Sequence, residues 1–197
     1  MLVDFSEQIS QHRSVLDRLV ELEPAFNRVV ACVIKTLENG GKIVLCGNGG
    51  SAADAQHIAA ELVGRFKQER RALPAIALTT DSSIITAVGN DYGYEEVFAR
   101  QVAALATEHD LLWVLSTSGH SVNITKALEV ARKVACTTVG FLGKSGGSAL
   151  ALCDVALVVP SEDTARIQEM HMLLYHAVCA AVDKYAIQSQ SLQHECA

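Results

Sequence analysis

Apolar positions along this chain follow two spacings, and the change from one to the other recurs. Near the N-terminus apolar residues return every three or four positions, which predicts a helix over 4–22 and a second from Pro24 to about Leu37. Beyond Gly41 short continuous apolar runs appear, each typical of a strand buried on both faces. We expect strands at 43–46, 75–80, 111–116, 136–143 and 154–160, and helices at 52–66, 123–134 and 164–187, with short helices after the second and fourth strands.

The order of these elements predicts the fold class. Strand, glycine- or serine-rich loop and helix repeat along the chain, which favours an α/β fold with a parallel sheet covered by helices on both faces. No linker, fixed-period repeat or break in composition divides the sequence. We therefore expect a single domain over 1–197.

Composition and charge narrow the class of protein. The chain has 197 residues, of which 50% are hydrophobic and 19% charged, so it can bury enough apolar surface to fold. The net charge of −6, with no block of more than two Lys or Arg residues, argues against a nucleic-acid or anionic-membrane partner. The N-terminus lacks the apolar stretch of a signal peptide, and no apolar run approaches the ~20 residues of a membrane span.

The cysteines indicate a compartment. None of the 6 belongs to a CxxC pair, and four lie in apolar runs, as expected of small buried side chains in a reducing environment. The sequence thus favours a globular cytoplasmic protein.

Three loops that follow predicted strands carry glycine and hydroxyl residues suited to phosphate. They lie at 47–51 (GNGGS), 116–121 (STSGHS) and 144–148 (KSGGS). Backbone N–H groups, hydroxyls and a helix N-terminus are the donors that a phosphate needs, and the second loop offers four hydroxyls in six residues. Tight turns with helix caps are the alternative. Neither a P-loop nor a dinucleotide fingerprint is present.

The helix after the first loop carries a polar face. Asp54, His57 and Glu61 share this face because their spacing is i, i+3 and i+7. His57 and Glu61 can both reach one divalent ion, and the carboxylate can also move a proton. A solvated polar face of an amphipathic helix is the alternative interpretation.

The final helix begins with a second polar cluster, at 166–176 (RIQEMHMLLYH). Gln168 and His176 are eight positions apart, which means a rise of about 12 Å and a rotation of about 80°. On this simple geometry His171 is the closer neighbour of Gln168. Packing of both histidines in a core or subunit interface is the alternative.

Two weaker features and the tail complete the candidates. The stretch 89–93 (GNDYG) is interpreted as a polar loop that can bind sugar hydroxyls, although Asn-Asp is also ordinary turn chemistry. Arg65 can pair with a phosphate or with an acid. The polar tail at 189–197 is expected to be a loose end.

Four segments in order carry a resemblance to a known family. CGNGGSAADAQHIAAEL (46–62), ALTTDSSIITAVGNDYGYEEVF (77–98), STSGHSVNI (116–124) and ARIQEMHMLLYH (165–176) resemble the phosphoheptose isomerases of the sugar isomerase (SIS) domain superfamily. The resemblance implies a flavodoxin-like three-layer sandwich with a parallel five-stranded sheet, a core at 42–187 and an N-terminal helical pair at 4–38 used for oligomerisation. It also implies a homotetramer with sites shared between subunits.

The resemblance further implies an activity and its residues. The family converts sedoheptulose 7-phosphate to D-glycero-D-manno-heptose 7-phosphate through an enediol, for bacterial surface polysaccharide, with one zinc ion per subunit. The implied zinc ligands are His57, Glu61, Gln168 and His176, so that the resemblance favours His176 over His171. Glu61 and His176 are the implied catalytic pair. The implied substrate contacts are Asn48, Gly49, Gly50, Ser51, Glu61, Arg65, Asn90, Asp91, Ser116, Thr117, Ser118, Ser121 and Gln168.

Two positions depart from the family pattern, and two other functions compete. His120 replaces an asparagine at what we interpret as a loop rim, and Ala165 stands where some relatives carry an acid, so a substrate contact would be missing there. The competing function is that of a non-enzymatic SIS-domain tetramer that binds the replication initiator protein. That relative lacks the counterparts of Glu61 and His176, so the enzyme is favoured. A sugar-phosphate sensor would come fused to a DNA-binding module, for which these 197 residues leave no segment.

Overall fold

The computed structural model describes residues 4–195, with side chains in the last helix described as far as Ser189. Its centre is a parallel sheet of five strands in the order β2-β1-β3-β4-β5. This is the flavodoxin-like doubly wound order, so the predicted fold class is confirmed. The strands are β1 (Ile43–Gly47), β2 (Ala75–Ala77), β3 (Leu111–Ser116), β4 (Thr137–Gly143) and β5 (Val155–Val159).

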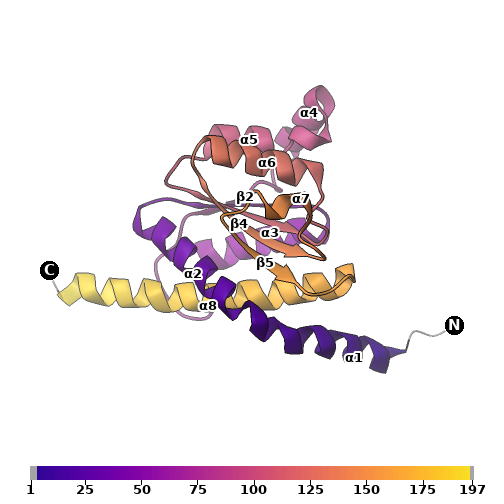
Figure 1. Cartoon of the computed structure of the whole chain (residues 1–197). Coiled ribbons are helices and arrows are strands. Elements are labelled where there is room, and N and C mark those ends of the chain that lie inside the picture. Colours follow the sequence, from indigo (N-terminus) through magenta and orange to yellow (C-terminus); the bar gives the residue numbers. More distant parts are fainter. Residues whose placement is uncertain (1–3, 196–197) are drawn as a thin grey trace.

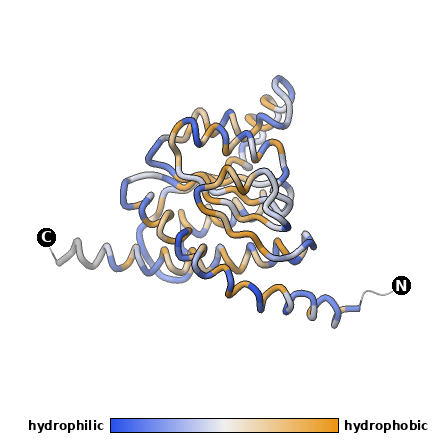
Figure 2. Tube along the Cα trace, viewed as in Figure 1, coloured by the Kyte–Doolittle hydropathy of each residue, from blue (hydrophilic) through white to orange (hydrophobic). Residues whose placement is uncertain are grey.

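Helices cover both faces of the sheet (Figure 1). One face carries α2 (Glu23–Glu38), α3 (Gly50–Val63) and α8 (Thr164–Glu195); the other carries α5 (Ala99–Leu105), α6 (Val122–Lys133) and α7 (Gly147–Leu150). Successive side chains of β3 alternate between the two layers: Trp113 packs with the first group of helices and Val114 with the second. Figure 2 shows the hydrophobic strands enclosed between helices whose outer positions are hydrophilic.

The registers of the strands bring the functional loops together. Gly47 at the end of β1 lies opposite Leu115 of β3, and Ser116 lies opposite Leu142 of β4. The loops that follow these three strands therefore start at the same edge of the sheet. The strand order also reverses between β1 and β3, which is where parallel α/β sheets open a crevice for ligands.

The N-terminal segment is less regular than the predicted helix over 4–22. It consists of α1 (Phe5–Leu16), capped by Asp4, and a 3-10 helix, η1 (Asp17–Leu22). The side chain of His12 contacts Glu169 of α8 at 2.8 Å, and Arg18 donates to the Pro160 carbonyl. In Figure 1 α1 runs outward beside α8, and its N-terminal end points away from the body of the molecule.

Several predicted boundaries are wrong, and the reasons are local. The helix expected over 52–66 begins at Gly50 and ends at Val63, because the chain turns at Gly64. The strand expected over 75–80 has three residues, since Asp81 soon caps α4 (Ser82–Tyr92). The predicted polar loop at 89–93 is mostly the last turn of α4. Sequence reasoning also missed η2 (Tyr94–Glu96) and α5.

The C-terminal boundary is also different, and the described cysteines are free. α8 continues through Glu195 instead of ending near 187 in a loose tail, and residues 196–197 lie outside the described part of the chain. Cys46, Cys136 and Cys179 are buried, whereas Cys32 and Cys153 are half-buried. In the part of the chain that is described, no helix is both long and apolar enough to cross a membrane.

Candidate active site

Two helices on the same face of the sheet bring three potential metal donors together. His57 and Glu61 lie one turn apart on α3, and Nε2 of the histidine is 3.0 Å from Oε1 of the glutamate. His176 comes from α8, with its ring centroid 5.0 Å from that of His57. One donor atom from each of the three residues lies within 4.8 Å of the others. Two imidazoles and a carboxylate are a donor set that suits zinc.

The histidine that joins α3 is His176 and not His171. The two lie about 140° apart around α8, because each residue turns the helix by about 100°. His171 points to the sheet, where it is fully buried and its Nε2 is 3.0 Å from the Leu142 carbonyl oxygen. Burial lowers its pKa to about 4, which this hydrogen bond offsets only partly. The expectation from helical spacing, that His171 rather than His176 accompanies Gln168 in the site, is therefore wrong. His171 is a core residue.

Gln168 joins the site through Asp54. Its amide Nε2 donates to Oδ2 of Asp54 at 3.0 Å, one turn before His57 on α3. The glutamine side chain lies against Gly50, where any Cβ would overlap the amide group. Burial raises the pKa of Asp54, and the hydrogen bond from Gln168 opposes that shift. Gly50 thus leaves the space in which Gln168 reaches the start of α3.

The aromatic residues around the histidines were not assigned a role from the sequence. The hydroxyl of Tyr175 is 3.0 Å from Nδ1 of His57, and the Phe66 ring stacks on His176 with a centroid distance of 5.2 Å. Burial, followed by the charge of Asp54, raises the pKa of the Tyr175 hydroxyl. The pKa of His176 is lowered by burial and by the nearby His57. A tyrosine next to a candidate ligand histidine was the available signal, but its spacing alone matches ordinary core packing.

The loop after β1 is held across the reversal of strand order. The side-chain amides of Asn48 and Asn123 exchange two hydrogen bonds, of 2.9 and 2.8 Å, and the Tyr94 hydroxyl donates to Oδ1 of Asn48 at 3.2 Å. Gly49 has a φ of 57° and a ψ of −122°, a conformation that favours glycine. Ser51 is buried in the first turn of α3. Asn123 was not predicted to be a site residue, although an asparagine in the first turn of α6 is a recognisable signal in the sequence.

The loop at 116–121 packs against the loop at 144–148, which places two of the three predicted phosphate loops side by side. Gly119 has a φ of 66°, and a Cβ there would collide with the backbone of Gly146. Ser116 accepts a hydrogen bond from the Gly119 N–H, and Ser118 accepts one from the His120 N–H. Ser121 precedes α6 but, within the described structure, its side chain makes no capping hydrogen bond. Its hydroxyl and the first N–H groups of α6 are therefore available to an anion.

Three residues that were predicted to contact the substrate make no hydrogen bond or ion pair with the metal donors or the loops in the described part of the chain. They are Arg65, Asn90 and Asp91. Arg65 lies beyond the end of α3, where its side chain is 56% exposed and pairs with Glu69 at 3.4 Å. Asn90 donates to Asp91 at 2.8 Å in the exposed last turn of α4. The fold thus brings the metal donors close together, whereas Arg65, Asn90 and Asp91 are exposed at the surface.

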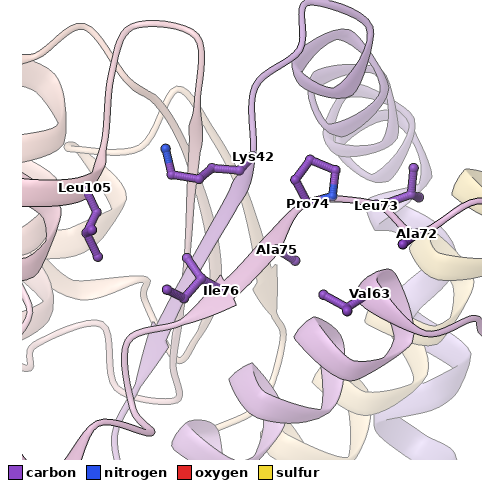
Figure 3. Close-up of a pocket in the computed structure, with 8 residues that line it drawn as sticks. All are labelled: Lys42, Val63, Ala72, Leu73, Pro74, Ala75, Ile76 and Leu105. Carbon is purple, nitrogen blue, oxygen red and sulfur yellow. The ribbon is translucent and has the colours of Figure 1, made fainter.

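A separate groove of about 450 Å³ lies beside the edge strand β2 (Figure 3). Its lining is apolar, with Val63, Ile76 and Leu105, except for Lys42 at the amino end of β1. The groove contains none of the predicted site residues and has neither a carboxylate nor an imidazole among its lining residues. It therefore lacks the groups that proton transfer on a sugar would need.

Comparisons with known proteins show which sequences and folds this chain resembles. Residues 7–143 match the model of the SIS domain family. The chain is 56% identical over 173 residues to the phosphoheptose isomerase of Aliarcobacter butzleri, covering 87% of this chain and 92% of that protein. The structure of phosphoheptose isomerase from Neisseria gonorrhoeae superposes with a TM-score of 0.82 at 44% identity, covering 91% of this chain and 95% of that one. A phosphoheptose isomerase structure from Francisella tularensis gives a TM-score of 0.85 at 40% identity, with coverage of 93% and 100%.

Proposed function

Because this chain belongs to the SIS domain family and, within it, to the phosphoheptose isomerases, we propose that it converts sedoheptulose 7-phosphate to D-glycero-D-manno-heptose 7-phosphate. The chain is a sugar-phosphate isomerase of heptose biosynthesis, the role that its relatives support over most of its length. The observation that carries the proposal is the convergence of Glu61 and His176 from two helices. Their presence also favours an enzyme over the non-enzymatic initiator-binding protein.

The reaction requires one proton to move between adjacent carbons and one between their oxygens. In the proposed mechanism Glu61 removes a proton from C1 of the ketose while His176, working from the opposite side of the substrate, protonates the C2 oxygen, which gives an enediol. A residue that ligates zinc is less free to move a proton, so the ligand and catalytic roles of these two residues alternate. Glu61 then returns its proton to C2, and His176 takes the proton of the C1 hydroxyl, so both residues regain their starting states. Oε1 of Glu61 faces His57, which leaves the second carboxylate oxygen for this proton transfer.

We propose that His57, Glu61 and His176 hold one zinc ion per subunit and that Gln168 is the fourth ligand. The three donor atoms lie close enough together to share an ion, and the set suits zinc. A zinc ion bound there would supply positive charge that polarises the substrate carbonyl. Gln168 is 3.0 Å from Asp54 through its amide nitrogen, so its carbonyl oxygen is the atom left to bind metal.

The distant phosphate is proposed to bind the loop at 116–121. Backbone N–H groups at the start of α6 and the hydroxyls of Ser116, Thr117, Ser118 and Ser121 are the donors for it. Asn48, Gly49, Gly50 and Ser51 would contact the sugar beside the metal donors. Binding energy gained at the phosphate would then orient the reacting carbons.

The functional protein is proposed to be a cytoplasmic homotetramer with sites shared between subunits, the helices at 4–38 forming contacts between subunits. Phe5 and Val20 are 75% and 70% exposed, and Met172 and Leu173 on α8 are also exposed. Apolar side chains of this size favour burial against another subunit. In such an assembly Arg65, Asn90 and Asp91 would contact a substrate that is bound at the site of a neighbouring subunit. Light scattering tests the assembly, because a monomer at micromolar concentration would contradict it.

The first experiment is an NMR time course with sedoheptulose 7-phosphate, with and without a strong chelator. We expect aldose signals to grow and to stop growing when zinc is removed. Glu61→Gln keeps the shape of the side chain but cannot take the proton, so turnover should fall at least about 100-fold while phosphate still binds. The matched control is Glu108→Gln, whose side chain is 66% exposed next to His109. Retained turnover in Glu61→Gln would refute the mechanism, and growth indifferent to the chelator would refute the role of zinc.

A further inference from the structure

A chain of polar contacts leads from Gln168 to the metal donor His57. Gln168 donates to Asp54, the Asp54 carboxylate acts on the Tyr175 hydroxyl and raises its pKa, and that hydroxyl lies 3.0 Å from Nδ1 of His57. Nε2 of the same imidazole faces Glu61. Tyr175 is fully buried and Asp54 is only 3% exposed, so little water reaches the hydroxyl or the carboxylate.

The proposed metal site sets the direction of these contacts. A histidine that binds a metal through Nε2 keeps its proton on Nδ1, and Nε2 of His57 is the nitrogen that faces Glu61. The hydrogen between His57 and Tyr175 then belongs to Nδ1, and the Tyr175 oxygen accepts it. The single proton of the hydroxyl is left to point towards the Asp54 carboxylate, which also accepts from the Gln168 amide.

The rings limit the imidazole as well as the hydrogen bond does. The Tyr175 ring meets His57 edge-on at a centroid distance of 5.4 Å and meets His176 in the same way at 4.7 Å. One buried side chain thus contacts both imidazoles of the donor group. Rotation of either ring would separate these contacts or break the bond at Nδ1.

We propose that Tyr175 is a positioning residue for the metal site. Its hydroxyl accepts a hydrogen bond from the Nδ1–H of His57 and donates one to the Asp54 carboxylate, so that the lone pair on Nε2 points at the ion. This inference rests on the zinc site of the proposed function. Metal-bound histidines commonly donate their other N–H to a carboxylate or carbonyl, and losing that partner weakens metal binding by about 10–100-fold. Here a buried phenol is inserted between the imidazole and the carboxylate.

The test compares Tyr175→Phe with Tyr185→Phe in the full-length protein. Both substitutions remove one hydroxyl from α8, but Tyr185 is half-buried and interacts with Glu38, outside the metal donors. Zinc affinity is measured on metal-free protein by competition with a chromogenic chelator. We expect Tyr175→Phe to bind zinc about 10–100-fold more weakly and Tyr185→Phe to bind it as the unsubstituted protein does. Equal affinity in Tyr175→Phe would overturn the proposal.

A second measurement separates positioning from general destabilisation. In the zinc-loaded protein the ring N–H of His57 is hydrogen-bonded, so its NMR signal should be visible and slow to exchange with water. Tyr175→Phe should lose that signal even where metal-free unfolding shows the same stability, and a retained signal would contradict the inference. If Tyr175→Phe does not fold, Asp54→Asn serves in its place, because removing the charge that orients the hydroxyl should move the same signal. If the unsubstituted protein binds no zinc, the proposed metal site itself is wrong, and that result precedes any comparison of variants.

Discussion

Arg70 and Asp183 form a buried ion pair that ties together the two helices of the site. Nε of Arg70 donates to Oδ1 of Asp183 at 2.9 Å, and the two side chains are only 1% and 3% exposed. Arg70 also donates to the carbonyl groups of Glu61, Leu62 and Gly64, at the end of α3. Asp183 lies on α8, two turns beyond His176. The pair therefore sets the position of α3 relative to α8, and hence that of Glu61 relative to His176.

Removing the charge of Asp183 should destabilise the protein strongly. Asp183→Asn leaves the Arg70 guanidinium buried without its counter-charge, which costs about 3–5 kcal/mol in free energy of unfolding. Denaturant titration measures the loss. The matched control Glu108→Gln changes an exposed carboxylate in the same way and should stay within about 0.5 kcal/mol. A loss below about 1 kcal/mol in Asp183→Asn would mean that the pair does not hold the helices.

Stability should fall as the pH drops from about 6.5 to 4, because of His171. Burial lowers the pKa of this histidine to about 4, below the unfolded value of about 6.5. Between these values the unfolded chain binds more protons than the folded one, so acidification favours unfolding, by roughly 3 kcal/mol over the full range. The check is a series of denaturant titrations of metal-free protein. His171→Gln should show a flatter dependence, and an unchanged slope would rule out His171 as its source.

Two histidines of α8 should respond differently to the same substitution. His176→Gln removes one of the three metal donors and should weaken zinc binding at least about tenfold, since even loss of a ligand's hydrogen-bond partner costs that much. His171→Gln should leave zinc affinity unchanged, because that side chain faces Leu142. Chelator competition measures both. Weaker zinc binding in His171→Gln alone would reverse the assignment.

Gly119 should not tolerate a side chain. Alanine there has to adopt a φ of 66° and would also strike the backbone of Gly146, so the two loops must separate. Gly40 has a φ of 77° but open space around a built Cβ, which makes Gly40→Ala the control for backbone strain alone, at about 1–2 kcal/mol. We expect Gly119→Ala to lose about 2 kcal/mol more and to bind inorganic phosphate more weakly. Equal losses in the two variants would show that the loop contact is unimportant.

The sequence predicted the architecture because short apolar runs alternate with loops and helices along the chain. Gly47 ends β1 and Ser116 ends β3, and the registers place these two ends at one edge of the sheet. Boundaries failed where a capping residue was decisive: Asp81 starts α4 early, and Gly64 ends α3 before Arg65. Such caps are single-residue signals that a periodic pattern does not contain.

The site was predictable within one helix and less so between helices. His57 and Glu61 are one turn apart, so their spacing alone placed them together. Which face of α8 meets α3 depends on packing between distant segments, and for that reason spacing favoured His171 while the structure selects His176. The roles of Tyr175 and Asn123 became visible only through contacts across 118 and 75 positions of sequence.

The paired amides of Asn48 and Asn123 would let the proposed sugar site distinguish hydroxylated from deoxy sugars. Asn123 gives and takes one hydrogen bond, and Asn48 gives one and takes two because the Tyr94 hydroxyl also donates to it, so a ligand that enters between the two amides has to exchange partners with them. A sugar hydroxyl both donates and accepts, so it can enter between the two amides and satisfy both. A deoxy carbon at the same place would either be kept out or part the amides without satisfying them. Discrimination between hydroxylated and deoxy sugars would then arise from the hydrogen bonds that these two asparagines make with each other.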